Sequence, residues 1–431
     1  MYTLAAEGGE GLGEARSAEA QGACSARWLV SLPLVVTLVT VAAVAVREVA
    51  DPDLWWHLAT GRYIWATRRI PVQDVFSFTA GSHRWVTHEW LADLLLYGGY
   101  RLVGLAGLVP LFALLIAAAF GLVYRRCRSS PFVAAPSVLL AASASAMTWG
   151  VRPQMVSLLF TSLYLYILDR GVAGRPRLVW LLPGLTLLWA NLHSGFVAGL
   201  VVVAVYAVGQ ELEWLAARAG EGPWLGPGVR RLLAVGLACL ACALVTPNGL
   251  AGALFPFGTL SNRLIQANIE EWFSPNFHLP LAWPLAVYWL ALLGVLALSR
   301  RRVGVTELLL LLGAGAMGLY SMRHVPFLSL VGAPVLAAQA ENLRPVRRVE
   351  RAGRRPSRLL RVAVVVGLVS LVVAVGARVY GVYRRSGEVE RALYPVGALG
   401  YMREHGLGGR VFNTYHWGGY LIWHGYQVFV D

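Results

Sequence analysis

Apolar side chains fill most of this chain in long stretches that short polar segments separate. Each stretch is close to the length of a helix that crosses a lipid bilayer, roughly 20 apolar residues. The pattern therefore predicts an all-α polytopic membrane protein with about eleven transmembrane helices. The predicted spans are 28–46, 104–124, 132–149, 154–168, a pair within 178–214, and then 231–245, 282–298, 305–320, 325–338 and 360–380.

Two stretches do not fit a single span. Residues 178–214 are too many for one crossing and slightly few for two, and we divide them at the polar sequence 191–195, Asn-Leu-His-Ser-Gly. Residues 249–260 are too short to cross, so we expect an interfacial or re-entrant segment there.

Arginines gather in alternate connections between the predicted spans. Clusters follow the second, fourth, sixth, eighth and tenth spans, whereas the connections between them hold Arg152, Arg263 and Arg323. The positive-inside rule then predicts a cytoplasmic N-terminus and an extracytoplasmic C-terminus in the plasma membrane. The net charge of +14 is distributed in short clusters between apolar runs, which argues against a nucleic-acid partner.

Composition divides the chain into three parts. Residues 1–27 are polar and rich in Gly, Ala and Glu, which predicts a disordered cytoplasmic segment. Residues 28–381 form the transmembrane domain, with a long first external loop at 47–102. Residues 386–431 predict a small external α/β fragment: a strand at 410–413, a helix at 419–424 and a strand at 427–430. The pattern stops in its middle at Asp431, so we expect a longer natural domain or a truncated chain.

Polar side chains from several separate loops are predicted to lie on the extracytoplasmic face. Ionisable groups at membrane depth cost roughly 2.5–3.5 kcal/mol on the insertion scale, so they usually mark function or an aqueous cavity. Their convergence from separate loops predicts a cleft. The candidates are Asp51, Asp53, His57, His88, Glu89, Arg152, Asn191, His193, Glu271, Arg323 and His324.

The richest segment begins the first external loop. Asp51 can cap a helix whose first residue is Pro52. Asp53 and His57 are four residues apart and would then share one helix face. The functional interpretation is a carboxylate pair that acts as general base or holds a divalent cation, Mg²⁺ or Mn²⁺. The structural alternative is a capped interfacial helix.

The other candidates also have two interpretations. Glu89 opens an apolar run, where it either favours the helix dipole or joins the Asp51 site. Arg152 and Arg323 either bind phosphate in fork geometry or extend to the interface as snorkelling side chains. Glu271 either lines the site or lies in a solvated turn. His193 has no charged neighbour in the sequence.

The first loop resembles that of a known enzyme superfamily. Its residues 51–58 (Asp-Pro-Asp-Leu-Trp-Trp-His-Leu) and 70–77 (Ile-Pro-Val-Gln-Asp-Val-Phe-Ser) are similar to the first external loop of GT-C membrane glycosyltransferases. The D-x-D-x-Y-H-L pattern of the oligosaccharyltransferase-like branch is the nearest. Many bacterial polytopic proteins of unassigned substrate look like this chain throughout, including its segments 88–91, 191–193 and 323–324.

The resemblance implies a function. It implies a polyprenyl-phosphate-linked sugar donor, a cell-envelope glycan, lipid or protein acceptor, and attack on the anomeric carbon with inversion. Asp51 or Asp53 would be the base or metal ligand, with Glu89 beside it, and Arg323 would hold the donor phosphate. The other candidates would line the substrate site.

The chain departs from the family in two respects. The tail has no W-W-D-Y-G-like acceptor motif, and no second D-x-D or E-x-E motif occurs, although Glu270-Glu271 is a loose candidate. No cofactor is therefore certain. A transporter or flippase of a lipid-linked intermediate and a non-catalytic membrane scaffold are the alternatives. Transporters place ionisable groups near the bilayer midplane, whereas an enzyme would hold them at one face.

Overall fold

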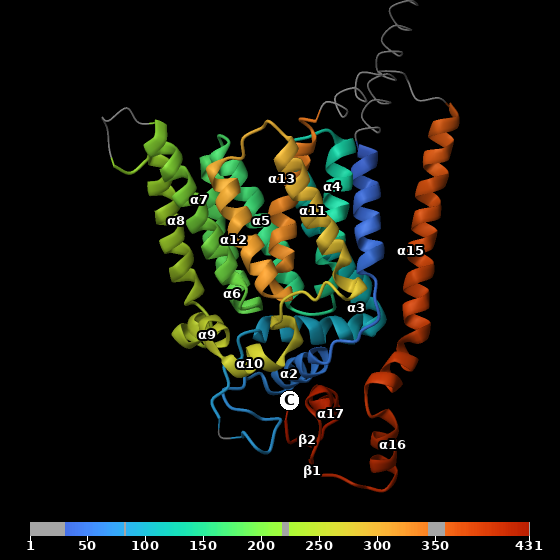
Figure 1. Ribbon diagram of the computed structural model, residues 1–431. Helices are drawn as coiled ribbons and strands as arrows, with labels where there is room; N and C mark the ends of the chain where they lie inside the picture. Colours follow the sequence, from blue (N-terminus) through green and yellow to red (C-terminus); the bar gives the residue numbers. More distant parts are fainter. Residues whose placement is uncertain (1–30, 82, 218–223, 344–357, 431) are drawn as a thin grey trace, which may run out of the picture.

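The computed structural model describes residues 31–81, 83–217, 224–343 and 358–430. The segment predicted to be disordered, 1–27, and most of the arginine-rich stretch 344–361 lie outside these residues. The described chain is mainly helical, and its long helices stand side by side (Figure 1). Short helices and the chain's C-terminal part gather at one end of this bundle, which we call the loop end.

The long elements follow the predicted order. They are the helix Ser31–Ala45, α3 (Trp90–Arg126), α4 (Pro131–Ser145) extended by η1 (Ala146–Thr148), α5 (Gln154–Val172), η2 (Pro176–Leu181) with α6 (Leu182–Leu192), α7 (Phe196–Ala217), α8 (Pro227–Ala243), η4 (Pro280–Ala282) with α11 (Trp283–Leu298), α12 (Val305–Tyr320), α13 (Val325–Ala340) and α15 (Arg358–Leu393).

Five of the described helices are long and apolar enough to cross a membrane: Trp90–Arg126, Pro131–Thr148, Gln154–Val172, Phe196–Ala217 and Pro280–Leu298. These helices indicate a multi-pass membrane protein. The number of about eleven spans is not confirmed, because some predicted spans form shorter apolar helices, among them Ser31–Ala45 and Val305–Tyr320.

The irregular points of the sequence coincide with breaks in the structure. α3 crosses the loop end and then turns into the bundle at Gly104, whose φ of 65° and ψ of −176° favour glycine (Figure 1). The predicted second span begins at this same residue. The chain also breaks between α6 and α7, at His193–Gly195, where the stretch 178–214 was divided. α9 (Gly249–Ser261) lies at the loop end, followed by α10 (Arg263–Asn268).

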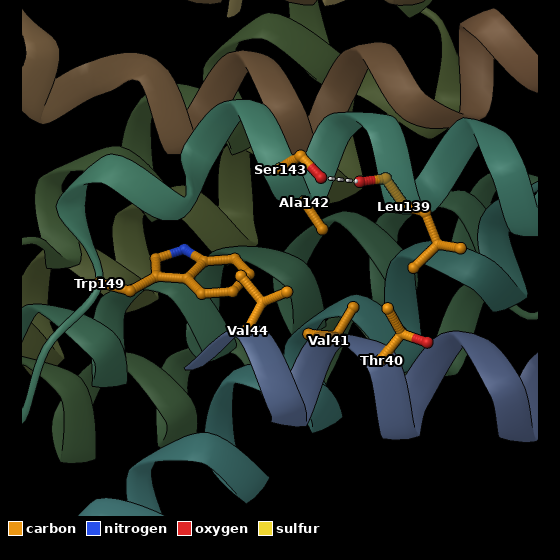
Figure 2. A pocket seen from close by; sticks show the side chains of 7 residues that line it. All are labelled: Thr40, Val41, Val44, Leu139, Ala142, Ser143 and Trp149. Carbon is orange, nitrogen blue, oxygen red and sulfur yellow. Dashed lines mark hydrogen bonds between the residues drawn. The ribbon is translucent and has the colours of Figure 1, made fainter. Parts of the chain in front are cut away.

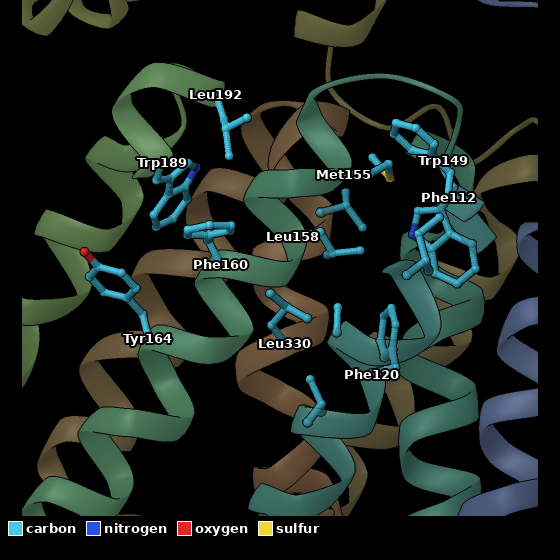
Figure 3. Close-up of a cluster of buried hydrophobic side chains, with 14 of the residues drawn as sticks. Phe112, Phe120, Trp149, Met155, Leu158, Phe160, Tyr164, Trp189, Leu192 and Leu330 are labelled. Carbon is cyan, nitrogen blue, oxygen red and sulfur yellow. The ribbon is translucent and has the colours of Figure 1, made fainter. Parts of the chain in front are cut away.

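Large side chains from α3, α5, α6 and α13 fill the centre of the bundle (Figure 3). Trp189 of α6 is fully buried and its ring lies 5.5 Å from Phe160 and 5.4 Å from Tyr164, both on α5. The Tyr164 hydroxyl donates to the Leu182 carbonyl oxygen at 3.0 Å. Such aromatic packing fixes α5 against α6 and so positions the loops that precede α5 and follow α6.

A small crevice lies between the helix Ser31–Ala45 and α4 (Figure 2). Its lining residues are Thr40, Val41, Val44, Leu139, Ala142, Ser143 and Trp149. The Ser143 hydroxyl donates to the Leu139 carbonyl oxygen one turn earlier, at 2.9 Å. None of these described lining residues is ionisable, so the crevice offers no acid–base chemistry.

The C-terminal residues form the predicted strand–helix–strand unit. β1 (Arg410–Val411) pairs in parallel with β2 (Gln427–Val428), and η6 (Tyr415–Trp417) and α17 (Gly418–Trp423) connect them. α16 (Val396–Glu404) precedes the unit. An isolated bridge between Ser77 and Val428 joins it to the first loop.

The same unit supports α2 (Asp53–Thr67), the first helix of the loop end. A Cβ at Gly419 of α17 would come within 2.9 Å of the Pro52 carbonyl oxygen, so only glycine permits this close approach. The ring of Trp55 packs edge-on against Tyr420 at 5.0 Å. The tail therefore fixes the start of α2, which carries Asp51 and Asp53.

Candidate functional site

The start of α2 holds the first two acids as the sequence predicts. The Asp51 carboxylate accepts a hydrogen bond from the Asp53 backbone N–H at 3.0 Å, and Pro52 follows with a helical φ of −63°. Asp51 thus caps the helix, and Asp53 and His57 lie one turn apart. These two side chains nevertheless contact different partners and belong to two separate clusters.

The first group, the carboxylate–arginine cluster, comprises Asp51, Asp53, Arg152, Glu271 and Arg323. The Arg152 Nε lies 3.0 Å from the Asp51 Oδ2, and its Nη2 lies 3.8 Å from the Asp53 Oδ2. The same guanidinium donates two hydrogen bonds to the Glu271 carboxylate. The Arg323 Nη1 also lies 3.5 Å from an oxygen of that carboxylate. Three acids from two segments thus surround one arginine.

Two short helices and the contacts between their segments hold Glu271 and Arg323 in place. Glu271 belongs to η3 (Glu270–Trp272), and Arg323 belongs to η5 (Met322–His324). The Ser321 hydroxyl donates to the Glu271 carbonyl oxygen at 2.9 Å. The Arg323 guanidinium lies over the buried Trp272 ring at 5.2 Å, a cation–π contact. These contacts fix the segment that carries Glu271, so it is not a solvated turn.

The carboxylates of this cluster differ in their surroundings. Burial, and then the neighbouring Asp51 carboxylate, raise the pKa of Asp53 above its usual value. Burial alone would raise the pKa of Glu271, but the charge and hydrogen bonds of Arg152 hold it below its usual value. The Asp53 side chain is 38% exposed, against 15% for Asp51. Asp53 is therefore the acid most available to a substrate.

The second group, the histidine–carboxylate cluster, comprises His57, His88, Glu89, Asp93 and His193. The Asp93 carboxylate lies 2.6 Å from the His57 Nδ1, and the Glu89 carboxylate lies 3.6 Å from the His57 Nε2. Glu89 is also approached by the Nε2 atoms of His88 at 3.4 Å and His193 at 3.3 Å. One carboxylate is thus enclosed by three imidazoles.

Gly61 makes the first of these contacts possible. A Cβ at Gly61 of α2 would collide with the Asp93 carbonyl oxygen of α3, so glycine lets the two helices touch at this point. His57 lies one turn before Gly61 on the same face of α2, and this places its ring against the Asp93 carboxylate.

The hydrogen bonds of His193 determine which of its nitrogens carries the proton. The Gly195 backbone N–H donates to the His193 Nδ1 at 2.8 Å, and the Ser157 hydroxyl lies 2.7 Å from that atom. The Trp189 indole N–H in turn donates to the Ser157 hydroxyl at 2.7 Å. A nitrogen that accepts cannot carry the proton of a neutral ring, so the proton is assigned to Nε2, which faces Glu89.

The ionisable side chains of this buried cluster have different pKa shifts and therefore different charges. Burial alone would lower the pKa of His57, but Asp93 and then Glu89 raise it to about 9. Burial would raise the pKa of Glu89, but His88 and then His193 hold it well below its usual range. Burial lowers the pKa of His193 to about 3. At neutral pH His57 is a cation and Glu89 an anion, whereas His193 is neutral.

Neither group suits a divalent cation in its described form. The ligand atoms of His57, Glu89 and Asp93 all lie within 4.8 Å of one another, but His57 must first lose a proton that its surroundings retain. Among the acids proposed from the sequence, Asp51 and Asp53, the Arg152 guanidinium already supplies the positive charge. The chemistry available to both groups is therefore acid–base and charge stabilisation.

The remaining candidates lie beside these clusters. The Asn191 carbonyl accepts from the Trp90 indole at 2.9 Å, and its amide donates to the carbonyl oxygens of Leu187 and Val245, both at 2.9 Å. Asn191 therefore ties α3, α6 and the end of α8 together. The His324 ring packs against the aromatic rings of Trp272 and Phe327.

Two site residues were missed from the sequence, Asp93 and Ser157. Asp93 is completely buried and lies four residues after Glu89, the same spacing as Asp53 and His57. That spacing was the available signal, since it places both acids on one face of α3. Ser157 gave no such signal, because a single serine in an apolar helix usually bonds its own backbone.

Comparison with known proteins gives a likeness of fold. The chain matches no protein family and no curated protein by sequence. Its structure is similar to the crystal structure of the apo oligosaccharyltransferase of Archaeoglobus fulgidus, with a TM-score of 0.52 and 12% sequence identity. The match covers 92% of this chain and 64% of that protein, so this chain spans less than two thirds of it. The chain therefore has a membrane-protein fold similar to that of this oligosaccharyltransferase.

Proposed function

We propose that this protein is a membrane glycosyltransferase. It would transfer a sugar from a polyprenyl-phosphate-linked donor to a cell-envelope acceptor, with inversion, on the extracytoplasmic face of a bacterial plasma membrane. One observation carries the proposal: the half-exposed Asp53 carboxylate, with a raised pKa, lies beside Arg152 in a cluster that also holds Arg323, at the loop end of a GT-C-like bundle. A transporter would be expected to hold such groups near the middle of its spans.

Asp53 is the proposed general base. The acceptor hydroxyl gives its proton to the Asp53 carboxylate as its oxygen forms a bond with the anomeric carbon. The bond between that carbon and the donor phosphate oxygen breaks, and the phosphate leaves with the electron pair. A carboxylate whose pKa is raised towards neutrality is a better base than an ordinary one.

Arg323 is the proposed partner of the donor phosphate. It has a single described carboxylate partner, Glu271 at 3.5 Å, and its side chain is 30% exposed. Its remaining N–H groups are therefore available to phosphate oxygens, which guanidinium matches in geometry. Arg152, which the sequence also proposed for phosphate, is instead engaged by the acids of the cluster.

Glu89 takes a positioning role in this proposal. Its carboxylate is enclosed by three imidazoles and is almost inaccessible, so it cannot easily reach a substrate. Together with His57 and Asp93, it fixes α2 against α3 and so places Asp53. Asp51 acts similarly, because it caps α2 and pairs with Arg152.

The test compares two matched variants. In a deletion strain of the source organism, wild type, Asp51→Asn or Asp53→Asn is expressed at equal protein level. Envelope glycans and lipid-linked sugars are then measured by mass spectrometry. We expect loss of one sugar in the deletion strain, full or partial restoration by Asp51→Asn, and a decrease of about 10²–10⁴-fold in transfer with Asp53→Asn. Asparagine keeps the cap of Asp51 but cannot act as a base.

Two results would contradict the proposal. If the glycans are unchanged in the deletion strain, the protein does not transfer an envelope sugar, and transport or a scaffolding role is favoured. If Asp53→Asn restores the glycan as well as wild type does, Asp53 is not the base.

A further inference from the structure

Four aromatic rings from three segments form a continuous band at the loop end. They are Trp65 of α2, Tyr97 and Tyr100 of α3, and Trp423 of α17. The ring centroids of Trp65 and Tyr97 lie 6.4 Å apart. The Trp423 ring lies 6.3 Å from Tyr97 and 5.3 Å from Tyr100. Trp65 is 40% exposed, so the band reaches the surface of the protein.

Three arginines lie over this band. The guanidinium carbons of Arg68 and Arg101 lie 5.3 Å and 5.7 Å from the centre of the Trp65 ring, and that of Arg62 lies 4.4 Å from the centre of Trp423. None of the three forms an ion pair with a carboxylate in the part of the chain that the structure describes. We call these four rings and three arginines the arginine–aromatic patch.

Arg68 occupies a backbone position that favours glycine. It follows α2 with a φ of 56° and a ψ of 27°, and every other described residue with a positive φ is a glycine. This left-handed conformation is strained for a residue with a side chain, and helices commonly end with glycine for that reason. An exposed arginine at such a position is consistent with a role of its guanidinium in binding.

Exposed apolar side chains border the patch where α3 turns into the bundle. Leu102 and Val103, which follow Arg101, are 85% and 54% exposed. Leu95 is also exposed and lies two turns before Leu102, on the same face of α3. Large apolar side chains exposed at the start of a membrane span are expected to contact lipid chains. The patch beside them therefore lies at the level of the lipid headgroups, where Trp and Tyr are enriched.

We propose that the arginine–aromatic patch binds the headgroup phosphate of an anionic phospholipid in the leaflet at the loop end. Guanidinium groups match phosphate oxygens in geometry, and these three have no carboxylate partner that competes with a lipid. The acyl chains would extend along Leu102 and Val103. Asp53 lies at the other end of α2, about 22 Å from Arg68 along the helix axis. The inference therefore does not depend on the proposed transferase activity.

The proposal is tested by native mass spectrometry of the purified full-length protein in detergent. The probes are phosphatidylglycerol, phosphatidylcholine with the same acyl chains, and a short-chain polyprenyl phosphate. We expect Arg68→Gln/Arg101→Gln to retain one phosphatidylglycerol per chain fewer than wild type, with at least about tenfold weaker binding at that site. Retention of phosphatidylcholine should not change, because its ammonium group cancels the charge of its phosphate.

The matched control is Arg84→Gln/Arg263→Gln. It removes the same charge from two other exposed arginines, which also have no described ion pair with a carboxylate. This variant should retain phosphatidylglycerol as wild type does. If both double variants lose it equally, the attraction comes from net charge alone and the proposal is overturned.

Arg68→Gly separates lipid binding from folding. Glycine adopts the left-handed backbone without strain, so the unfolding midpoint in detergent should be unchanged or higher. Loss of the guanidinium should nevertheless weaken the binding of phosphatidylglycerol. If Arg68→Gly binds this lipid as tightly as wild type, Arg68 does not contact the headgroup and the proposal is wrong.

The polyprenyl phosphate distinguishes two sources of the bound phosphate. If Arg68→Gln/Arg101→Gln weakens its binding about tenfold and leaves phosphatidylglycerol unchanged, the patch serves the lipid-linked donor and the assignment to a phospholipid is overturned. If polyprenyl phosphate depends on Arg323 and phosphatidylglycerol depends on Arg68 and Arg101, the two sites are separate and the proposal is supported.

Discussion

The two polar clusters lie one helical turn apart on α2, yet they neutralise their acids in opposite ways. Asp53 faces a cluster in which arginines supply a permanent charge and two side chains are about 30% exposed. His57 faces a cluster in which histidines surround the acids and Asp93 is fully buried. Guanidinium does not titrate, whereas imidazole titrates near neutral pH. The difference suggests that the first cluster serves substrates and that the second secures the fold in a pH-dependent way.

The largest expected effect follows from breaking the buried cluster. His57→Gln removes the cation between Glu89 and Asp93 and leaves the fully buried Asp93 carboxylate without its ion-pair partner. We expect the free energy of unfolding in detergent to fall by about 3–5 kcal/mol, the usual cost of a broken buried pair. His405→Gln is the matched control, because His405 is exposed and lies directly after the end of α16. A loss below about 1 kcal/mol in His57→Gln would show that this cluster does not secure the fold.

The pH dependence of stability sharpens the same comparison. The folded-state pKa of His57 is raised to about 9, so its contribution is complete below the unfolded value of about 6.5 and is lost as pH rises through 9. The pKa of His193 is lowered to about 3, so its contribution is complete above about 6.5 and declines as pH falls. The lowered pKa of Glu89 adds to the acid decline, below its unfolded value.

Stability should therefore pass through a maximum near pH 6.5. From there to pH 9 we expect the wild-type free energy of unfolding to fall by up to about 3 kcal/mol, from the shift of His57. The measurement is chemical unfolding at fixed detergent between pH 4 and 10. His57→Gln should lose most of the alkaline decline and keep the acid one. An alkaline decline of equal size in the variant would assign it to other groups.

The smallest expected effect concerns Arg323. Arg323→Gln should weaken the binding of a short-chain polyprenyl phosphate by about tenfold, the loss of one charge-assisted hydrogen bond, with little change in stability. Arg263→Gln provides the control, since Arg263 is an exposed arginine of α10. Binding is measured by native mass spectrometry in detergent. Equal affinity in Arg323→Gln and wild type would remove Arg323 from the proposed phosphate site.

Much of the fold can be predicted from local sequence. Runs of apolar residues locate the long helices, because a helix in lipid must satisfy its own backbone and expose apolar side chains. The start of the span at Gly104, the break near His193, the separate segment 249–260 and the strand–helix–strand tail all appear in the structure. These features depend on nearby residues alone. The predicted number of spans is not confirmed, because several predicted spans form apolar helices shorter than a membrane crossing requires.

The polar contacts could not be predicted to the same extent. Sequence spacing brings Asp53 and His57 to one face of α2, but the partner of each lies on a different segment. From the sequence, Arg152 was interpreted as a phosphate ligand or a snorkelling side chain. Its ion pairs with three acids form only because the fold brings the start of α2, the loop before α5 and η3 together.

The sequence by itself determined which residues could carry charge, where the helices lie and which loops are rich in acids. Only the tertiary structure decided that these acids divide into two clusters, that Asp93 joins the buried one and that Arg152 lies between carboxylates. The physical reason is the distance along the chain over which each kind of interaction acts. Helix formation and membrane insertion depend on neighbours within a turn or a span. The ion pairs that define the two clusters instead join segments far apart in the chain, 36 residues for His57 and Asp93 and 119 for Arg152 and Glu271.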